Sequence, residues 1–127
     1  MPGITFDAGA LTAAERGDSR FFAAWKTLLA DQVIPTVPAP VVAQVWRNGA
    51  KQARLALVLR GCHVEELTYA RARRVGELCA KAGVADTTDA AVVLTAADRG
   101  EELLTSDPDD LTRIAAAYAR PPRIRTL

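Results

Sequence analysis

Aspartates recur in the second half of the chain at points where helices are predicted to begin. One group opens an apolar helical run that ends at Gly100, and the other follows the short apolar segment 101–105. The aspartates of these two groups are Asp86, Asp89, Asp107, Asp109 and Asp110. Asp is a common helix cap that interacts favourably with the helix dipole, and Pro108 is typical of a first helical position. Taken singly, each aspartate is best interpreted as a cap.

Asp7 gives these aspartates a second interpretation, as ligands of a metal ion. It ends the apolar segment Ile4–Phe6. If this segment and the one at 101–105 are strands of one parallel sheet, Asp7 and Asp107 lie at carboxyl ends of strands, where open α/β sheets bind their ligands. Asp89 would join them from a helix. Carboxylates this close repel one another unless a cation lies among them, so the pattern predicts a divalent metal site.

Length and composition favour one compact domain over residues 1–127, because half of the residues are hydrophobic. The net charge of +1 gives no global electrostatic footprint for nucleic acid, so any RNA contact must be local. Cys62 and Cys79 have no paired spacing and His63 is the single histidine, a pattern that suggests neither a disulfide framework nor a thiolate zinc site. No apolar stretch approaches the ~20 residues of a membrane span, so we expect a cytoplasmic protein with no membrane partner.

Strands and helices are predicted to alternate along the chain. The predicted strands are 4–7, 33–37, 64–67, 101–105 and 123–127. Pro35 predicts that strand 33–37 lies towards a sheet edge, and the last helix is expected to continue until Pro121. The arginines of helix 69–82 are expected to form a solvated face. The alternation predicts an α/β fold, a three-layer α/β/α sandwich with a mainly parallel central sheet of about five strands.

Three short motifs together resemble the PIN domain, in particular the VapC-like toxin ribonucleases. They are the segments 4–11 (ITFDAGAL), 88–93 (TDAAVV) and 104–107 (LTSD), the last followed by Asp110 and Leu111. The spacing from Asp89 to Asp107 is also similar to that of the family. This resemblance implies a PIN-like fold and a metal-dependent endoribonuclease that uses Mg²⁺ or Mn²⁺. It also implies an RNA substrate, a cognate antitoxin and often a homodimer.

The resemblance implies roles for individual acidic residues. The matching catalytic and metal-binding positions are Asp7, Asp89 and Asp107, with Asp110 and Asp86 as outer acids. The fourth acid of the family is a glutamate on the helix after the second strand, where this chain has Gln44. Glutamine keeps an oxygen and the side-chain length but removes one negative charge, and Gln44 is retained as a candidate metal ligand.

Two basic clusters are candidates for contacts with RNA phosphates. The first, around the third helix, contains Arg47, Lys51 and Arg54, and the second, near the chain end, contains Arg120, Arg123 and Arg125. Most surface arginines are simply solvated, so neither cluster alone predicts binding. Arg47 is the stronger candidate because it follows Gln44 closely, and Arg16 is expected to reach the site from the first helix.

Two alternative functions use the same residues. A PIN-like RNA- or protein-binding module with weak or lost catalysis would follow if Gln44 disables the site. A phospho-acceptor or phosphatase-type domain also places aspartates at strand ends, but it requires a lysine near its nucleophile, and no lysine follows Lys81. The ribonuclease is therefore the first hypothesis and the binding module the second.

Overall fold

The computed structural model describes residues 3–127, which fold around a five-stranded parallel sheet in the order β3-β2-β1-β4-β5. The strands are β1 (Ile4–Phe6), β2 (Thr36–Pro38), β3 (His63–Glu65), β4 (Glu102–Thr105) and β5 (Ile124–Thr126). All pairs of neighbouring strands are parallel. The predicted α/β fold with about five mainly parallel strands is confirmed.

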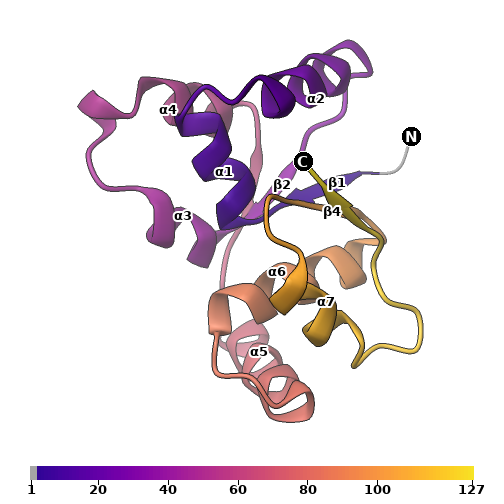
Figure 1. Cartoon of the computed structure of the whole chain (residues 1–127). Helices are drawn as coiled ribbons and strands as arrows, with labels where there is room; N and C mark the ends of the chain where they lie inside the picture. The colour runs from indigo at the N-terminus through magenta and orange to yellow at the C-terminus, as the bar shows by residue number, and fades with distance from the viewer. Residues whose placement is uncertain (1–2) are drawn as a thin grey trace.

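Helices cover both faces of the sheet, and in Figure 1 α1, α2 and α4 lie on one side and α5, α6 and α7 on the other. The helices are α1 (Ala8–Glu15), α2 (Ser19–Ala30), α3 (Ala39–Val45), α4 (Ala53–Arg60), α5 (Tyr69–Ala82), α6 (Thr87–Arg99) and α7 (Asp109–Ala115), with a 3₁₀ turn at Gly49–Lys51. On the α1 and α2 side, Phe6 packs edge-on against Phe21, with ring centroids 5.4 Å apart. No helix of residues 3–127 is both long and apolar enough to cross a bilayer.

The second strand is shorter than predicted and does not lie at an edge. It begins at Thr36, after Pro35, and pairs with β1 on one side and β3 on the other. Pro35 has no backbone N–H to donate, but it lies outside the strand, so the sheet loses no hydrogen bond. The Pro35 carbonyl accepts a hydrogen bond from the His63 backbone N–H at 2.8 Å. The edge strand on this side is β3. The expectation of an edge position from Pro35 was wrong because the proline precedes the strand.

The last helix is also shorter than predicted, because α7 ends at Ala115. The backbone N–H groups of Ala117 and Tyr118 then donate to carbonyls three residues earlier, at 3.0 Å each. Such tighter bonds close a helix end, and the chain leaves the helix axis before Pro121. The segment that follows is thus free to place β5 beside β4.

The arginines of α5 are not a simple solvated face, contrary to expectation. Arg71 pairs with Glu65 at 2.6 Å and Arg74 pairs with Asp98 at 2.6 Å, so α5 is tied to β3 and α6. Arg73 is exposed, and its guanidinium lies 5.8 Å from the centre of the exposed Tyr69 ring.

The half-buried carboxylate of Glu101 joins β1 and β2 at the amino end of the sheet. Thr5 donates its hydroxyl to Glu101 at 2.9 Å, and Thr36 donates to the other carboxylate oxygen at 3.4 Å. Arg99 lies 3.4 Å from the same carboxylate. Gly3 lies beside this group, and a Cβ at residue 3 would force the Glu101 carboxylate to shift. This edge is thus filled and neutralised, in contrast to the carboxyl edge described below.

Candidate functional site

The carboxyl ends of the two central strands bring Asp7 and the β4–α7 loop together. Phe6 of β1 is in register with Leu104 of β4, and the Asp7 backbone N–H donates to the Leu104 carbonyl at 3.3 Å. The chain enters α1 directly after Asp7 and reaches Asp107 two residues after β4 ends. As predicted, both aspartates therefore follow adjacent parallel strands at the same edge of the sheet.

Asp7 is held on both of its carboxylate oxygens. Oδ1 accepts the backbone N–H of Ala10 at 2.8 Å, which caps α1, and Oδ2 accepts the Thr105 hydroxyl at 2.5 Å. The side chain is only 5% exposed. Burial raises the pKa of Asp7, and nearby Asp107 raises it further, against the lowering effect of the two hydrogen bonds. Asp7 therefore caps α1, and its hydrogen bonds do not fully compensate for the burial of its negative charge.

Asp89 lies in the first turn of α6 and is the centre of the acidic cluster. Its pKa is raised to about 6, first by desolvation and then by the charges of four other aspartates. These four are Asp86, Asp7, Asp110 and Asp107. The aspartates that the sequence singled out as candidate ligands therefore lie close enough to repel Asp89, which is the electrostatic signature of a site that favours a cation.

The remaining aspartates differ in how far their side chains serve as caps. Asp86 caps α6, because its carboxylate accepts the backbone N–H of Asp89 at 3.0 Å. Asp107 is exposed, and the N-cap position of α7 is Pro108, without a side-chain cap. Asp110 is exposed in the first turn of α7. The cap interpretation therefore holds for Asp86 and Asp7 but does not account for Asp107.

Thr105 organises the site and was given no role from the sequence. Its hydroxyl, fully buried at the end of β4, binds Asp7, lies 3.1 Å from the Asp107 carbonyl and accepts the Asp107 backbone N–H at 3.0 Å. One side chain thus fixes the two strand-end aspartates relative to each other. The sequence feature that could have identified Thr105 is a polar residue at the last buried position of a strand, directly before Ser106 and Asp107.

The donor set suits a hard cation, although the side chains do not form a closed cage. Among residues 3–127, no three Asp, Glu, His or Cys side chains are grouped closely enough to hold one ion as they stand. Mg²⁺ commonly binds through one or two carboxylates and keeps several waters, so a closed cage is not required. Asp89 and Asp107, with Asp7 behind them, supply carboxylate oxygens of the right kind.

Gln44 is exposed on α3, the helix that follows β2 directly at the carboxyl edge. This helix contacts both α1 and α6, which carry Asp7 and Asp89 at their starts. The role of Gln44 as a ligand stays a prediction.

The two arginines expected to contact RNA, Arg47 and Arg16, lie at the ends of helices α3 and α1. Arg47 donates its guanidinium to the carbonyls of Ala43 at 3.0 Å and Trp46 at 2.7 Å, at the end of α3. Arg16 is the C-cap of α1, at the opposite end of that helix from Asp7. With a rise of ~1.5 Å per residue, the two ends are roughly 14 Å apart. RNA contact by either arginine stays a prediction.

Comparison with solved structures supports the architecture. The chain is similar to VapBC2 from Rickettsia felis, solved bound to a DNA fragment from its promoter, with 13% identity, a TM-score of 0.74 and 98% of each chain covered. It is also similar to PAE2754 from Pyrobaculum aerophilum, with 17% identity, a TM-score of 0.66, and 97% of this chain and 83% of that one covered. At these identities the likeness concerns the fold.

No curated protein matches the sequence significantly. A family model, however, matches nearly the whole chain, from β1 with its terminal Asp7 through to the segment after α7. The matched residues, 4–117, include every aspartate of the cluster. The chain therefore belongs to the PIN domain family.

Proposed function

We propose that this protein is a metal-dependent ribonuclease that cleaves RNA phosphodiester bonds and serves as the toxin of a toxin–antitoxin pair. Membership of the PIN domain family supports nuclease activity. The observation that carries the proposal is the convergence of Asp7, Asp107 and Asp89. The first two follow adjacent parallel strands at the carboxyl edge, and both act electrostatically on Asp89 in the first turn of α6. A structural helix start requires no such accumulation of negative charge, whereas a divalent cation does.

The residues take separate roles in this proposal. Asp89 and Asp107 bind the cation, Asp7 supplies a buried charge oriented by Thr105, and Asp86 and Asp110 add outer negative charge. When bound, Mg²⁺ or Mn²⁺ supplies Lewis acidity for hydrolysis and offsets charge on the phosphoryl and leaving oxygens. Gln44 approaches this group from α3, and Arg47 and Arg16 are proposed RNA contacts.

Cleavage of a single-stranded RNA tests the catalytic part of the proposal. The wild-type protein should cut the RNA with Mn²⁺ or Mg²⁺ and should stop when EDTA removes the metal. Asp89→Asn and Asp107→Asn should each lose most of the activity. Asp109→Asn is the matched control, because Asp109 is an exposed aspartate in the first turn of α7 that is not among the main causes of the raised pKa of Asp89. Cleavage that survives EDTA, or an equal loss in the control, would refute the proposal.

The antitoxin part rests on the PIN family and on the solved VapBC2 complex that this chain resembles. We propose a cytoplasmic toxin that pairs as a homodimer and is restrained by the product of an adjacent gene. Overexpression of the wild-type protein should slow growth, and co-expression of the adjacent gene product should restore it. Asp89→Asn should not slow growth. Unaffected growth at full expression of folded wild-type protein would exclude a toxin.

A binding module without catalysis is the second candidate, favoured by the amide at Gln44 in place of a carboxylate. In that case the protein would bind RNA or a protein partner but would not cut RNA at saturating Mn²⁺. Restored cleavage in Gln44→Glu would then identify the missing charge as the cause.

A further inference from the structure

Three exposed arginines lie in the last segment of the chain. Arg125 is within β5, Arg123 directly precedes β5, and Arg120 lies between α7 and β5. Arg120, Arg123 and Arg125 are exposed, and none forms an ion pair with any residue in 3–127. By contrast, the arginines at the α5–α6 contact are paired with Glu65 and Asp98. The net charge of the chain is only +1, so this cluster is a local feature of one sheet edge.

Strand β5 leads to the acidic site. It pairs with β4 in parallel, with Arg125 opposite Leu104 and Thr126 opposite Thr105. The backbone N–H of Leu127 donates to the Thr105 carbonyl at 2.9 Å. Thr105 holds Asp7 through its hydroxyl, so the end of β5 lies one strand away from the carboxylate cluster.

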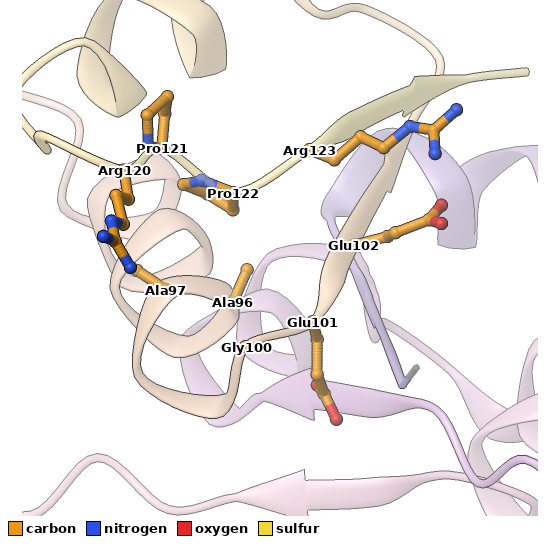
Figure 2. A pocket seen from close by; sticks show the side chains of 9 residues that line it. All are labelled: Ala96, Ala97, Gly100, Glu101, Glu102, Arg120, Pro121, Pro122 and Arg123. Carbon is orange, nitrogen blue, oxygen red and sulfur yellow. The ribbon is translucent and has the colours of Figure 1, made fainter. Parts of the chain in front are cut away.

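Two of these arginines follow one another closely at the start of β5. Arg123 directly precedes the strand and Arg125 lies within it, so alternation along an extended chain places their side chains on the same side, with Cα atoms roughly 6.6 Å apart. Arg125 and Arg20 line a hollow of about 310 Å³ between β5 and α2. At the amino end, Arg120 and Arg123 line a second hollow of about 230 Å³, shown in Figure 2 beside Pro121 and Pro122.

Within residues 3–127, the outer edge of β5 has no neighbouring strand, since β5 is last in the sheet order. Its alternate backbone N–H groups point away from β4 and can donate to an acceptor. Arginine forks and backbone N–H groups are the donors that bind phosphate oxygens. Arginines on a free edge also discourage pairing with a second strand, so this edge fits a polyanion better than a peptide.

We propose that the β5 edge, defined by Arg120, Arg123 and Arg125, binds the phosphates of single-stranded RNA and leads the strand to the carboxylate site. This inference rests on the proposed function. Arg125 should contribute more to RNA binding than Arg123. Leu103 of β4 pairs with Ile124, so Glu102 lies beside Arg123, and in Figure 2 the two side chains extend on the same side. The negative charge of Glu102 therefore offsets part of the positive charge of Arg123. Arg125 instead lies opposite the apolar Leu104.

The test measures RNA affinity separately from cleavage. In an Asp89→Asn background without added metal, the anisotropy of a labelled single-stranded RNA is followed over a range of salt concentrations. Arg123→Ala with Arg125→Ala should weaken binding on the order of tenfold at low salt and reduce the salt slope by about 1.4, or ~0.7 per phosphate contact. The matched control, Arg60→Ala with Arg73→Ala, removes the same charge from exposed residues without ion pairs and should change neither quantity comparably.

The outcomes separate this inference from the proposed function. An equal loss in the control pair, or no loss in the edge pair, would overturn the edge inference even if the wild type cleaves RNA. A specific loss in the edge pair would support it even if no cleavage is seen, a result that would refute the ribonuclease alone. Among single variants, Arg125→Ala should lose more affinity than Arg123→Ala. Unchanged melting temperatures would show that the edge variants remain folded.

Discussion

Removing the negative charge of Asp89 should stabilise the metal-free protein at neutral and higher pH. In the folded protein the pKa of Asp89 is raised from 3.8 to about 6. A raised carboxyl pKa means that the stability contribution is present below pH ~4 and is lost as the pH rises through ~6. Asn is similar in shape to the protonated carboxyl and cannot ionise, so Asp89→Asn should not show this loss.

The size of the effect follows from the pKa shift. A difference of about 2 units corresponds to roughly 3 kcal/mol in the free energy of unfolding as an upper limit. Solvent screening of the partly exposed side chain reduces this figure. Ionised Asp89 in the first turn of α6 also gains ~0.3–1 kcal/mol from the helix dipole, which the substitution removes. A net stabilisation of about 1 kcal/mol at pH 8 remains, or roughly 3–5 °C in melting temperature.

Thermal unfolding of wild type and Asp89→Asn in EDTA, from pH 4 to pH 8, measures this difference. The two curves should nearly coincide at pH 4 and separate above pH ~6, with the variant more stable. Asp109→Asn provides the control, because it removes an exposed charge from the first turn of α7 and should be no more stable than wild type at any pH. If Asp89→Asn melts below wild type at pH 8, Asp89 is a structural group and the electrostatic basis of the site is wrong.

Three further predictions concern the metal, α3 and the amino edge. Mn²⁺ or Mg²⁺ should raise the melting temperature of wild type at pH 8 by mass action and raise that of Asp89→Asn less; equal shifts would show that Asp89 is not a ligand. Gln44→Glu should bind Mn²⁺ about tenfold more tightly if a screened gain of ~1.4 kcal/mol is realised, and cleavage at low Mn²⁺ should rise with it; an unchanged affinity would mean that residue 44 does not face the site. Gly3→Ala should lower the free energy of unfolding by about 1–3 kcal/mol through its clash with Glu101, as measured by chemical denaturation. Gly76→Ala, with open space around its Cβ in α5, should raise it by about 0.5–1 kcal/mol. Equal effects of the two substitutions would show that the Glu101 carboxylate moves aside freely.

The sequence predicted elements well where periodicity and capping agree. Helix α5 has the predicted bounds, Tyr69–Ala82, because it combines an apolar stripe, a Thr68 cap and Gly83 in a left-handed conformation. Strand β2 was placed too early because an apolar run gives no register, and only pairing with β1 and β3 fixes where a strand begins. The buried network of Glu101 could not be predicted, since its partners are distant in the sequence and meet only through the sheet.

The acidic site shows why helix caps and metal ligands are difficult to separate by sequence alone. A parallel strand that enters a helix places an aspartate at the one position where its carboxylate can both accept a helix N–H and point towards the carboxyl edge. Asp7 does both, with one oxygen on Ala10 and the other on Thr105. The two interpretations are therefore not exclusive for a single residue. What distinguishes a site is the accumulation of negative charge around Asp89. The main causes that raise its pKa are burial and four other aspartates, an arrangement that helix capping does not require.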